Sequence, residues 1–372
     1  MNLNSILKRE GIEVKLKLDD AQVNEIASII SEKICDAFPE HNLDLENVRS
    51  CIADLDMYIA DMPNDSSVAK YFYKNNSIYF NKNADFDTMD TLVIHECIHA
   101  LQELENDRGK VLRLGLYNVL SNKGQGINEA AVQFMAAKAT NTEPDSVKYY
   151  NMDFTSDSPL YYPIETALIS QIIYFTGSYP LFHSTLHSND VFKNTFSAKC
   201  GKQIYNIIEE NFDNLIQYEE NLSFYAAELA TSSKTDKEKS KLTEKIEKIK
   251  NDIKNLTIST QDLIIKSCFY GEYDLIRDEK TLNEFRRKLY NFKDILINTE
   301  SYTFFNDFYC EMMNKLEEKS KLIKEYGVLL HINELQTDLL NLQKEYYGLK
   351  FFRRLFAKIK LLFGESVKEK DM

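Results

Sequence analysis

The sequence predicts an α+β fold that is predominantly α, on three observations. Glycine and proline are scarce, at 11 and 6 of 372 residues, so long uninterrupted helices are expected. Residues 68–80 are rich in aromatic and β-branched side chains, which indicates a small β-hairpin or sheet. After residue 219, apolar residues recur every three or four positions among lysines and glutamates, which is typical of packed helices.

These changes in composition and in the spacing of apolar residues predict four regions along the chain. We expect an N-terminal helical region at 1–62, a central α+β domain at 63–218, a helical coiled-coil or bundle domain at 219–347, and a basic amphipathic helix with its tail at 348–372.

Composition narrows the class of protein. Apolar residues make up 44% and charged residues 28% of the chain, which is typical of a soluble globular protein. The formal charge of −13 argues against a nucleic-acid partner. The six cysteines are widely spaced without a C-x-x-C pattern, which fits reduced thiols. We see no leader peptide and no apolar run of membrane-spanning length, so we expect a cytoplasmic protein.

The first region carries no evident chemistry. We expect one helix from Asp19 or Asp20 to Ile34, and a second from Leu45 to Ile59. His41, which follows a proline in a predicted loop, is expected to be exposed.

A β-hairpin is expected next. Its strands are Val68–Tyr73 and Ser77–Phe80, separated by a turn containing two asparagines. An exposed edge of this hairpin could bind an extended substrate as an additional strand. Alternatively, the hairpin only packs against the helix that follows it.

The most informative stretch is Thr88–Leu104, whose centre reads His95-Glu96-Cys97-Ile98-His99. Asp87 or Thr88 is a suitable N-cap, and the segment has no glycine or proline, so it should be helical. Residues i and i+4 share a helix face, so the two imidazoles can bind one tetrahedral Zn²⁺. Glu96 is offset by about 100°, which places its carboxylate beside a metal-bound water as a general base. The alternative is a helical histidine pair without a metal.

A catalytic zinc site needs a third protein ligand and an open position for water. A glycine-rich connection, with one short helix expected near Val111–Leu120, leads to Asn128-Glu129 at the start of an alanine-rich helix. Asn128 is a plausible N-cap, and Glu129 in the first turn is the favoured third ligand. The alternative is that the helix dipole alone favours Glu129 there. Other candidates for the third ligand are His183, His187 and Asp107.

These residues resemble the gluzincin group of zinc metallopeptidases over about residues 68–140. The resemblance implies a zincin-like domain with an edge strand, a metal helix and a glutamate helix. It also implies that His95, His99 and Glu129 bind one zinc ion per chain, and that Glu96 is the catalytic base. The spacing from His99 to Glu129 is longer than in thermolysin-like enzymes, and Gln133 stands where those enzymes carry an acid, so no family within the group is assigned.

Two further features bear on the site. The metzincin pattern fails, because it requires glycine and histidine where this chain has Gln102 and Glu105. Gln133, one turn after Glu129, could hydrogen-bond a ligand, or could simply pack.

Hydrolysis also needs an oxyanion donor, for which the candidates are Tyr161, Tyr162, His183 and His187.

The rest of the chain is expected to be helical. Helices are predicted over Ile164–Phe175 and 181–218. Two segments with a heptad pattern of apolar residues then predict an antiparallel helical hairpin or small bundle. The first seam consists of Leu242, Ile246, Ile249, Ile253 and Leu256. The second seam consists of Ile332, Leu335, Leu339, Leu342 and Tyr346. The helix expected over Leu349–Phe363 carries five basic residues and no acid opposite an apolar face. It could contact an anionic membrane surface, bind a partner, or dock on the acidic body.

The sequence therefore predicts a zinc metallopeptidase that acts on peptides or proteins through a metal-activated water, with Glu96 as general base. The alternative is a helical interaction protein, or one peripheral to a membrane, that has an inactive or structural zinc site.

Overall fold

The structure is a computed structural model that describes residues 7–9, 11–62, 68–84, 90–230, 235–325, 337 and 339–341. The chain divides into two compact units. The first comprises Met1–Leu275 and Lys288–Phe308, and the second comprises Ile276–Arg287 and Tyr309–Met372. Helices dominate and the sheets are small, which confirms the predicted α+β, predominantly α, class.

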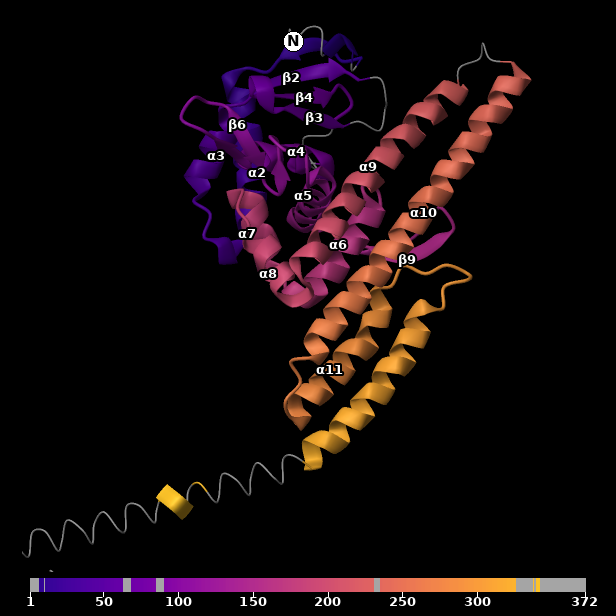
Figure 1. The fold of residues 1–372 in the computed structure, drawn as a ribbon. Coiled ribbons are helices and arrows are strands. Elements are labelled where there is room, and N and C mark those ends of the chain that lie inside the picture. The colour runs from indigo at the N-terminus through magenta and orange to yellow at the C-terminus, as the bar shows by residue number, and fades with distance from the viewer. Residues whose placement is uncertain are drawn as a thin grey trace, which may run out of the picture. The chain divides into compact units, whose positions relative to one another are not determined.

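The first unit begins with a four-stranded sheet (Figure 1). Its strands are β1 (Glu13–Lys17), β2 (Asp56–Asp61), β3 (Ala69–Phe72) and β4 (Ser77–Asn81), in the order β1-β2-β4-β3. The predicted hairpin is confirmed, because β3 pairs antiparallel with β4. Strand β4 also pairs in parallel with β2, so β3 is an edge strand.

The helix expected over Leu45–Ile59 is only half right. Helix α3 (Leu45–Ala53) ends early, and β2 follows it. Met57 and Ala60 of β2 are fully buried, and the strand lies between β1 and β4. Pairing on both sides therefore overrides the helical periodicity of the sequence here.

Nine helices of the first unit are described in full: α2 (Asp20–Ala37), α3, α4 (Thr91–Leu101), α5 (Gln125–Ala139), α6 (Pro163–Thr176), α7 (Tyr179–His187), α8 (Val191–Cys200), α9 (Lys202–Ala230) and α10 (Asp236–Tyr273). The predicted helices near 19–34, 164–175 and 181–218 are thereby confirmed. Other elements of the chain are β5 (Glu103–Glu105), β6 (Val111–Leu114), β7 (Tyr117–Asn118), β8 (Asp145–Tyr149), β9 (Met152–Ser156), α11 (Glu279–Asn291), most of which belongs to the second unit, and the 3₁₀ turns η1 (Pro39–His41), η2 (Tyr73–Asn75) and η3 (Phe292–Ile295).

Helix α5 lies at the centre of the first unit and packs against α4, α6 and α9. Its small side chains allow close approach: a Cβ at Gly126 would lie 2.1 Å from the carbonyl oxygen of Phe212 on α9. The helix also begins earlier than predicted. Its first turn is capped from α9, since Asp213 accepts hydrogen bonds from the amides of Gly124 and Gly126 at 2.9 and 2.8 Å. Asn128 is therefore inside the helix and is not its N-cap.

The short helix expected near Val111–Leu120 is wrong, because β6 and β7 occupy this segment. A tight turn at Gly115, whose φ is +55°, joins the two strands. A Cβ there would lie 2.4 Å from Asn128 Oδ1, so this glycine lets the turn approach α5 closely.

The long helices α9 and α10 lie side by side (Figure 1). Leu242, Ile246 and Ile253 of the first predicted seam are buried on α10. The second seam and the basic helix over 349–363 fall almost entirely outside the described residues. In the second unit, residues 309–325 are helical, with Met312 and Leu316 buried.

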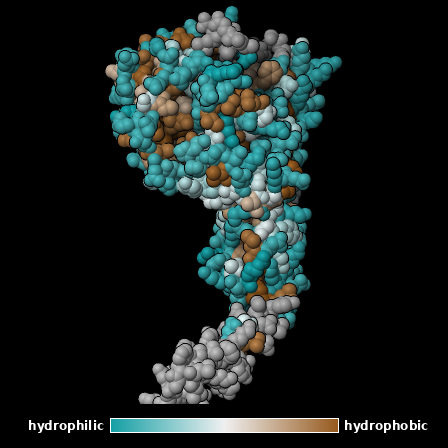
Figure 2. Space-filling view, turned by 60° about the vertical axis from the view of Figure 1, so that its left-hand side comes forward, coloured by the Kyte–Doolittle hydropathy of each residue, from teal (hydrophilic) through white to brown (hydrophobic). Residues whose placement is uncertain are grey.

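The visible surface is mostly hydrophilic, with hydrophobic side chains in separate small groups (Figure 2). Among the described residues, no helix combines the length and apolar character needed to cross a bilayer.

Candidate metal centre

The helix predicted around His95 and His99 is confirmed as α4, which spans Thr91–Leu101. Its N-cap is Asp90, whose side chain accepts a hydrogen bond from the Leu92 amide at 2.8 Å. The caps expected at Asp87 or Thr88 lie outside the described residues. The apolar side of α4, including Ile94 and Ile98, is fully buried, and this fixes the direction in which its histidines point.

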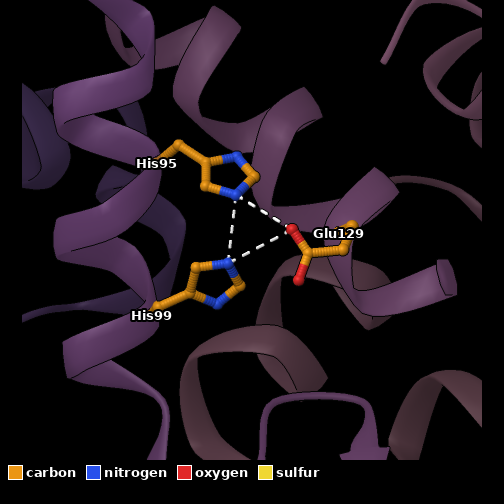
Figure 3. Close-up of side chains that lie close together, drawn as sticks. All are labelled: His95, His99 and Glu129. Atoms are coloured by element: carbon orange, nitrogen blue, oxygen red, sulfur yellow. Dashed lines mark hydrogen bonds and ion pairs between the residues drawn. The ribbon is translucent and has the colours of Figure 1, made fainter. Parts of the chain in front are cut away.

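His95, His99 and Glu129 converge, as Figure 3 shows. The His95 Nε2 atom lies 3.0 Å from His99 Nε2 and 3.1 Å from Glu129 Oε2, and His99 Nε2 lies 3.5 Å from the same oxygen. A tetrahedral zinc with bonds of about 2.05 Å has ligand–ligand edges of about 3.3 Å. The three donor atoms therefore match one face of such a tetrahedron, and the group can hold a metal ion. Among the described histidine, cysteine and acidic residues, this is the one group of three with that geometry.

Both imidazoles are oriented by buried amides. His95 Nδ1 lies 2.8 Å from Gln133 Oε1, and His99 Nδ1 lies 3.0 Å from Gln102 Oε1. Because an amide oxygen only accepts, this network assigns the ring proton to Nδ1 in both residues. In the neutral form of each ring, the Nε2 lone pair then faces the other donors, as a metal ligand requires.

The two amides are themselves held in place. Gln133 donates to the Ser158 hydroxyl at 2.8 Å, so its oxygen faces His95. Gln102 donates to Asn128 Oδ1 at 3.2 Å, and the same oxygen accepts the Leu116 amide at 2.9 Å. Asn128 thus links the end of α4 to α5 and to the turn between β6 and β7.

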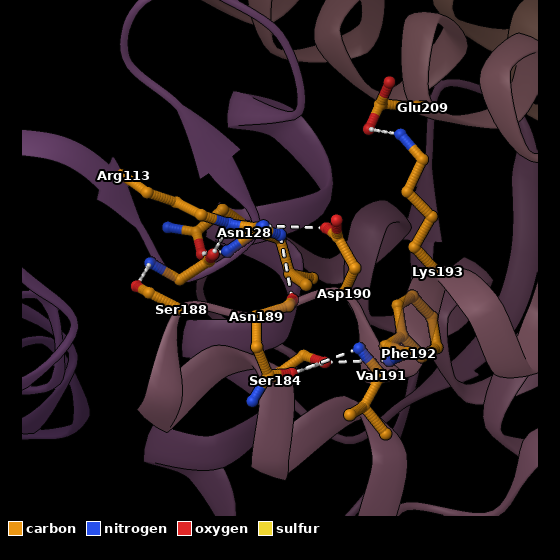
Figure 4. Close-up of polar contacts among 12 residues, drawn as sticks. Arg113, Asn128, Ser184, Ser188, Asn189, Asp190, Val191, Phe192, Lys193 and Glu209 are labelled. Carbon is orange, nitrogen blue, oxygen red and sulfur yellow. Dashed lines mark hydrogen bonds and ion pairs between the residues drawn. The ribbon is translucent and has the colours of Figure 1, made fainter. Parts of the chain in front are cut away.

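A further polar network supports that turn (Figure 4). Ser188 donates to the carbonyl of Gln102 and accepts from the amide of Gly115 at 2.7 Å. Arg113 donates to the carbonyl of Gly115 at 2.6 Å, and pairs with Asp190 at 2.7 Å. Four segments distant in sequence therefore position the residues that orient His99.

The charge of the Glu129 carboxylate favours binding of a cation at this site. Burial raises the pKa of the Glu129 carboxyl, but the imidazoles of His99 and His95 more than offset this, and its pKa lies well below the usual value. Burial lowers the pKa of His99, but the Glu129 carboxylate raises it to about 9. Glu129 thus remains ionised and attracts a positive charge between the two rings.

Glu96 lies beside this group and faces strand β3. Its Oε2 accepts a hydrogen bond from the Tyr71 amide at 2.8 Å. That amide is therefore not part of the β3–β4 ladder and points to the free edge of the sheet. Burial raises the pKa of Glu96, and the two histidines lower it by less. The residue therefore has a greater tendency to take up a proton than an exposed glutamate has.

Of the predicted oxyanion donors, Tyr162 lies next to the site. Its ring stacks on His95 with centroids 5.7 Å apart and planes 11° from parallel. Burial, together with Glu129 and Glu96, raises its pKa well above the usual value, so the phenol keeps its proton. Its φ of +48° is uncommon for a non-glycine residue, and such strain clusters at functional sites.

His183, His187 and Asp107 lie elsewhere. His183 and His187 are on α7, where His183 lies 6.1 Å from His41 between ring centroids. Asp107 is exposed in the turn after β5. None of the three joins the group formed by Glu129.

The expectation that His41 is exposed is wrong. The residue is 8% exposed and stacks on Tyr179 at 4.7 Å between centroids. Phe38 and Phe182 pack around it, because the 3₁₀ turn η1 folds back onto α7.

The residues that orient the two histidines could not be predicted from the sequence, with the exception of Gln133. For Gln133 the sequence allows two interpretations, a hydrogen bond to a ligand or simple packing. Gln102, Asn128 and Ser158 are common polar residues without a motif. Their roles depend on contacts between segments that are separated by 25 or 26 positions.

No known protein family, curated protein or solved structure matches this chain.

Proposed function

We propose that this chain is a zinc-dependent peptidase with a zincin-like catalytic centre of the gluzincin type. The observation that carries the proposal is the convergence of His95 Nε2, His99 Nε2 and Glu129 Oε2. Three protein donors leave the fourth tetrahedral position open, which is the arrangement of catalytic rather than structural zinc sites.

Each residue then has a definite task. A zinc ion held by His95, His99 and Glu129 would act as a Lewis acid and would lower the pKa of a water bound to it. Glu96, which lies beside the three donors, accepts a proton from the attacking water and passes it to the leaving amine. Tyr162 donates a hydrogen bond to the oxyanion as the carbonyl is attacked.

Strand β3 supports the assignment of a peptide substrate. It is the edge strand of its sheet, and its Tyr71 amide already points away from β4 toward Glu96. A peptide that adds to this edge as a strand would run past the proposed base. The hydrogen bond from the Tyr71 amide to Glu96 also fits the alternative, in which the hairpin only packs against α4 and supports Glu96.

The proposal is tested with Glu96→Gln, which removes the base and leaves the three donors in place. We expect zinc content to stay at one per chain while turnover of a broad peptide library is lost. The matched control is Glu105→Gln, an exposed glutamate on β5. An active Glu96→Gln protein would refute the assigned role.

A second candidate is a helical interaction protein with an inactive or structural zinc site. The long paired helices α9 and α10 favour it, since they provide an extended surface beyond the needs of a catalytic centre. Stoichiometric zinc without turnover of the library would support this candidate. Liposome sedimentation with and without residues 348–372 tests membrane contact through the basic segment, and equal sedimentation would count against it.

A further inference from the structure

Two cysteines distant in sequence lie in contact in the first unit. Cys200 is the last residue of α8, and its Sγ lies 2.8 Å from the Sγ of Cys268 on α10. Both are free thiols. Their separation of 68 positions explains why the sequence alone gives no sign of the pair.

The backbone holds the two sulfurs together. Gly271, one turn after Cys268, lies so close to α8 that a Cβ on it would be 2.1 Å from the carbonyl oxygen of Lys199. Because this contact is between main chains, the approach of α8 to α10 does not depend on flexible side chains. The Lys199 ammonium also pairs with Glu272 across the same contact at 3.5 Å.

The two thiols differ in reactivity. Cys200 is partly exposed, whereas Cys268 is fully buried. The hydrogen bond from Cys268 lowers the pKa of Cys200, and Lys199 lowers it further. Burial raises the pKa of Cys268. An accessible thiol with increased thiolate character next to a buried partner is the arrangement of an attacking and a resolving cysteine.

We propose that Cys200 and Cys268 form a reversible disulfide by exchange with a small disulfide of the glutathione type. The Cys200 thiolate attacks one sulfur of the small disulfide, and its S–S bond breaks to release one thiolate. The Cys268 thiol loses its proton to solvent, and its sulfur attacks Cys200 Sγ to release the second small thiol. Two protein thiols are oxidised and one small disulfide is reduced.

The bond would link elements that support the metal centre. The closed loop of 200–268 contains all of α9, whose Asp213 caps the helix that carries Glu129. Closing a loop of this length lowers the unfolding equilibrium constant by up to about a thousandfold in the chain-entropy model. Oxidation therefore stabilises the first unit, whether or not the protein is a peptidase.

The test uses the full chain in buffers of reduced and oxidised glutathione. Alkylation and peptide mass mapping should find a Cys200–Cys268 link that forms under oxidising conditions and is reversed by reduced glutathione. Thermal unfolding should occur at a higher temperature in the oxidised form. Cys310→Ser, which changes an exposed cysteine, is the matched control and should leave both results unchanged.

Two variants test the order of attack. Cys268→Ser should accumulate a mixed disulfide with glutathione at Cys200, because the resolving thiol is missing. Cys200→Ser should remain unmodified at the buried Cys268. The proposal is overturned if the wild type forms no such link in the most oxidising buffer, if another cysteine pairs instead, or if glutathione is found on Cys268.

Discussion

Replacing Gln133 by leucine should weaken zinc binding without unfolding the protein. Gln133 is fully buried, and its Oε1 is the acceptor for the Nδ1–H of His95 at 2.8 Å. Leucine has a similar volume but no acceptor. His95 then loses the contact that fixes its tautomer and its orientation toward Glu129.

The size of the effect follows from the contacts. Loss of a hydrogen bond that orients a metal ligand typically costs 10–100-fold in affinity, which corresponds to about 1.4–2.7 kcal/mol. Leaving one buried N–H without an acceptor costs about 1–3 kcal/mol, in agreement with that range. The Ser158 hydroxyl is not left without an acceptor, because it already donates to the carbonyl of Tyr161 at 2.7 Å.

The assay is competition for zinc between the metal-free protein and a chromophoric chelator. Gln217→Leu, an exposed position on α9, is the matched control and should bind zinc as the wild type does. Ser158→Ala should give a smaller loss, because it only frees Gln133 to rotate. If folded Gln133→Leu protein binds zinc within twofold of wild type, the account of how His95 is oriented is wrong.

Four further predictions concern the site and its support. Glu129→Ala should lower zinc affinity by more than the hundredfold upper range for supporting residues, and unchanged metal content would exclude Glu129 as a ligand. Tyr162→Phe should keep zinc and lower kcat about a hundredfold with little change in KM; an unchanged kcat in peptide turnover would exclude it as oxyanion donor. Gly126→Ala should destabilise the protein by about 3 kcal/mol in urea unfolding, because the added methyl meets the α9 backbone at 2.1 Å; an effect below 1 kcal/mol would show that α9 moves freely. Glu165 is fully buried, and burial raises its pKa from 4.5 to about 7. The native state therefore keeps a proton that the unfolded chain releases between pH 4.5 and 7, so stability falls as pH rises through this window. Burial also raises the pKa of Glu219, to which Glu165 is electrostatically coupled, so Glu165→Gln should reduce that fall, by about 2.5 kcal/mol between pH 5 and pH 8, and not abolish it; parallel stability–pH curves would contradict this.

The parts of the fold that depend on local periodicity could be predicted from the sequence. Helix α4 and the β3–β4 hairpin are examples, because their patterns are set by neighbouring residues. Strand β2 could not, because its conformation depends on pairing with β1 and β4 on either side. The same holds for β6 and β7, where one glycine turn replaces the expected helix.

The residues of the site also fall into those that local sequence predicts and those that depend on distant contacts. His95 and His99 are recognisable because one helical turn separates them, and Glu129 because a zinc site needs a third donor. The sequence predicts too late a start for α5, because the cap of this helix, Asp213, lies more than 80 positions further along the chain on α9. Local sequence shows that Asn128 can cap a helix, but not that a carboxylate from another helix already does so.

Because α9 holds α5 in place, metal binding at this group would be coupled to folding. Two of the donors are on α4 and one is on α5, so the group exists only while these helices hold their native positions. Asp213 and the Gly126–Phe212 contact set the position of α5, and the Gln102–Asn128 hydrogen bond joins α5 to the end of α4. A ligand that binds only the native arrangement stabilises it by RT ln(1 + [L]/Kd), about 4 kcal/mol at a thousandfold excess over Kd. Zinc should therefore raise the unfolding temperature of the wild type and recover part of the stability lost in Gly126→Ala. A zinc-independent unfolding temperature in protein that has bound zinc would mean that the donors stay together without the packing described here.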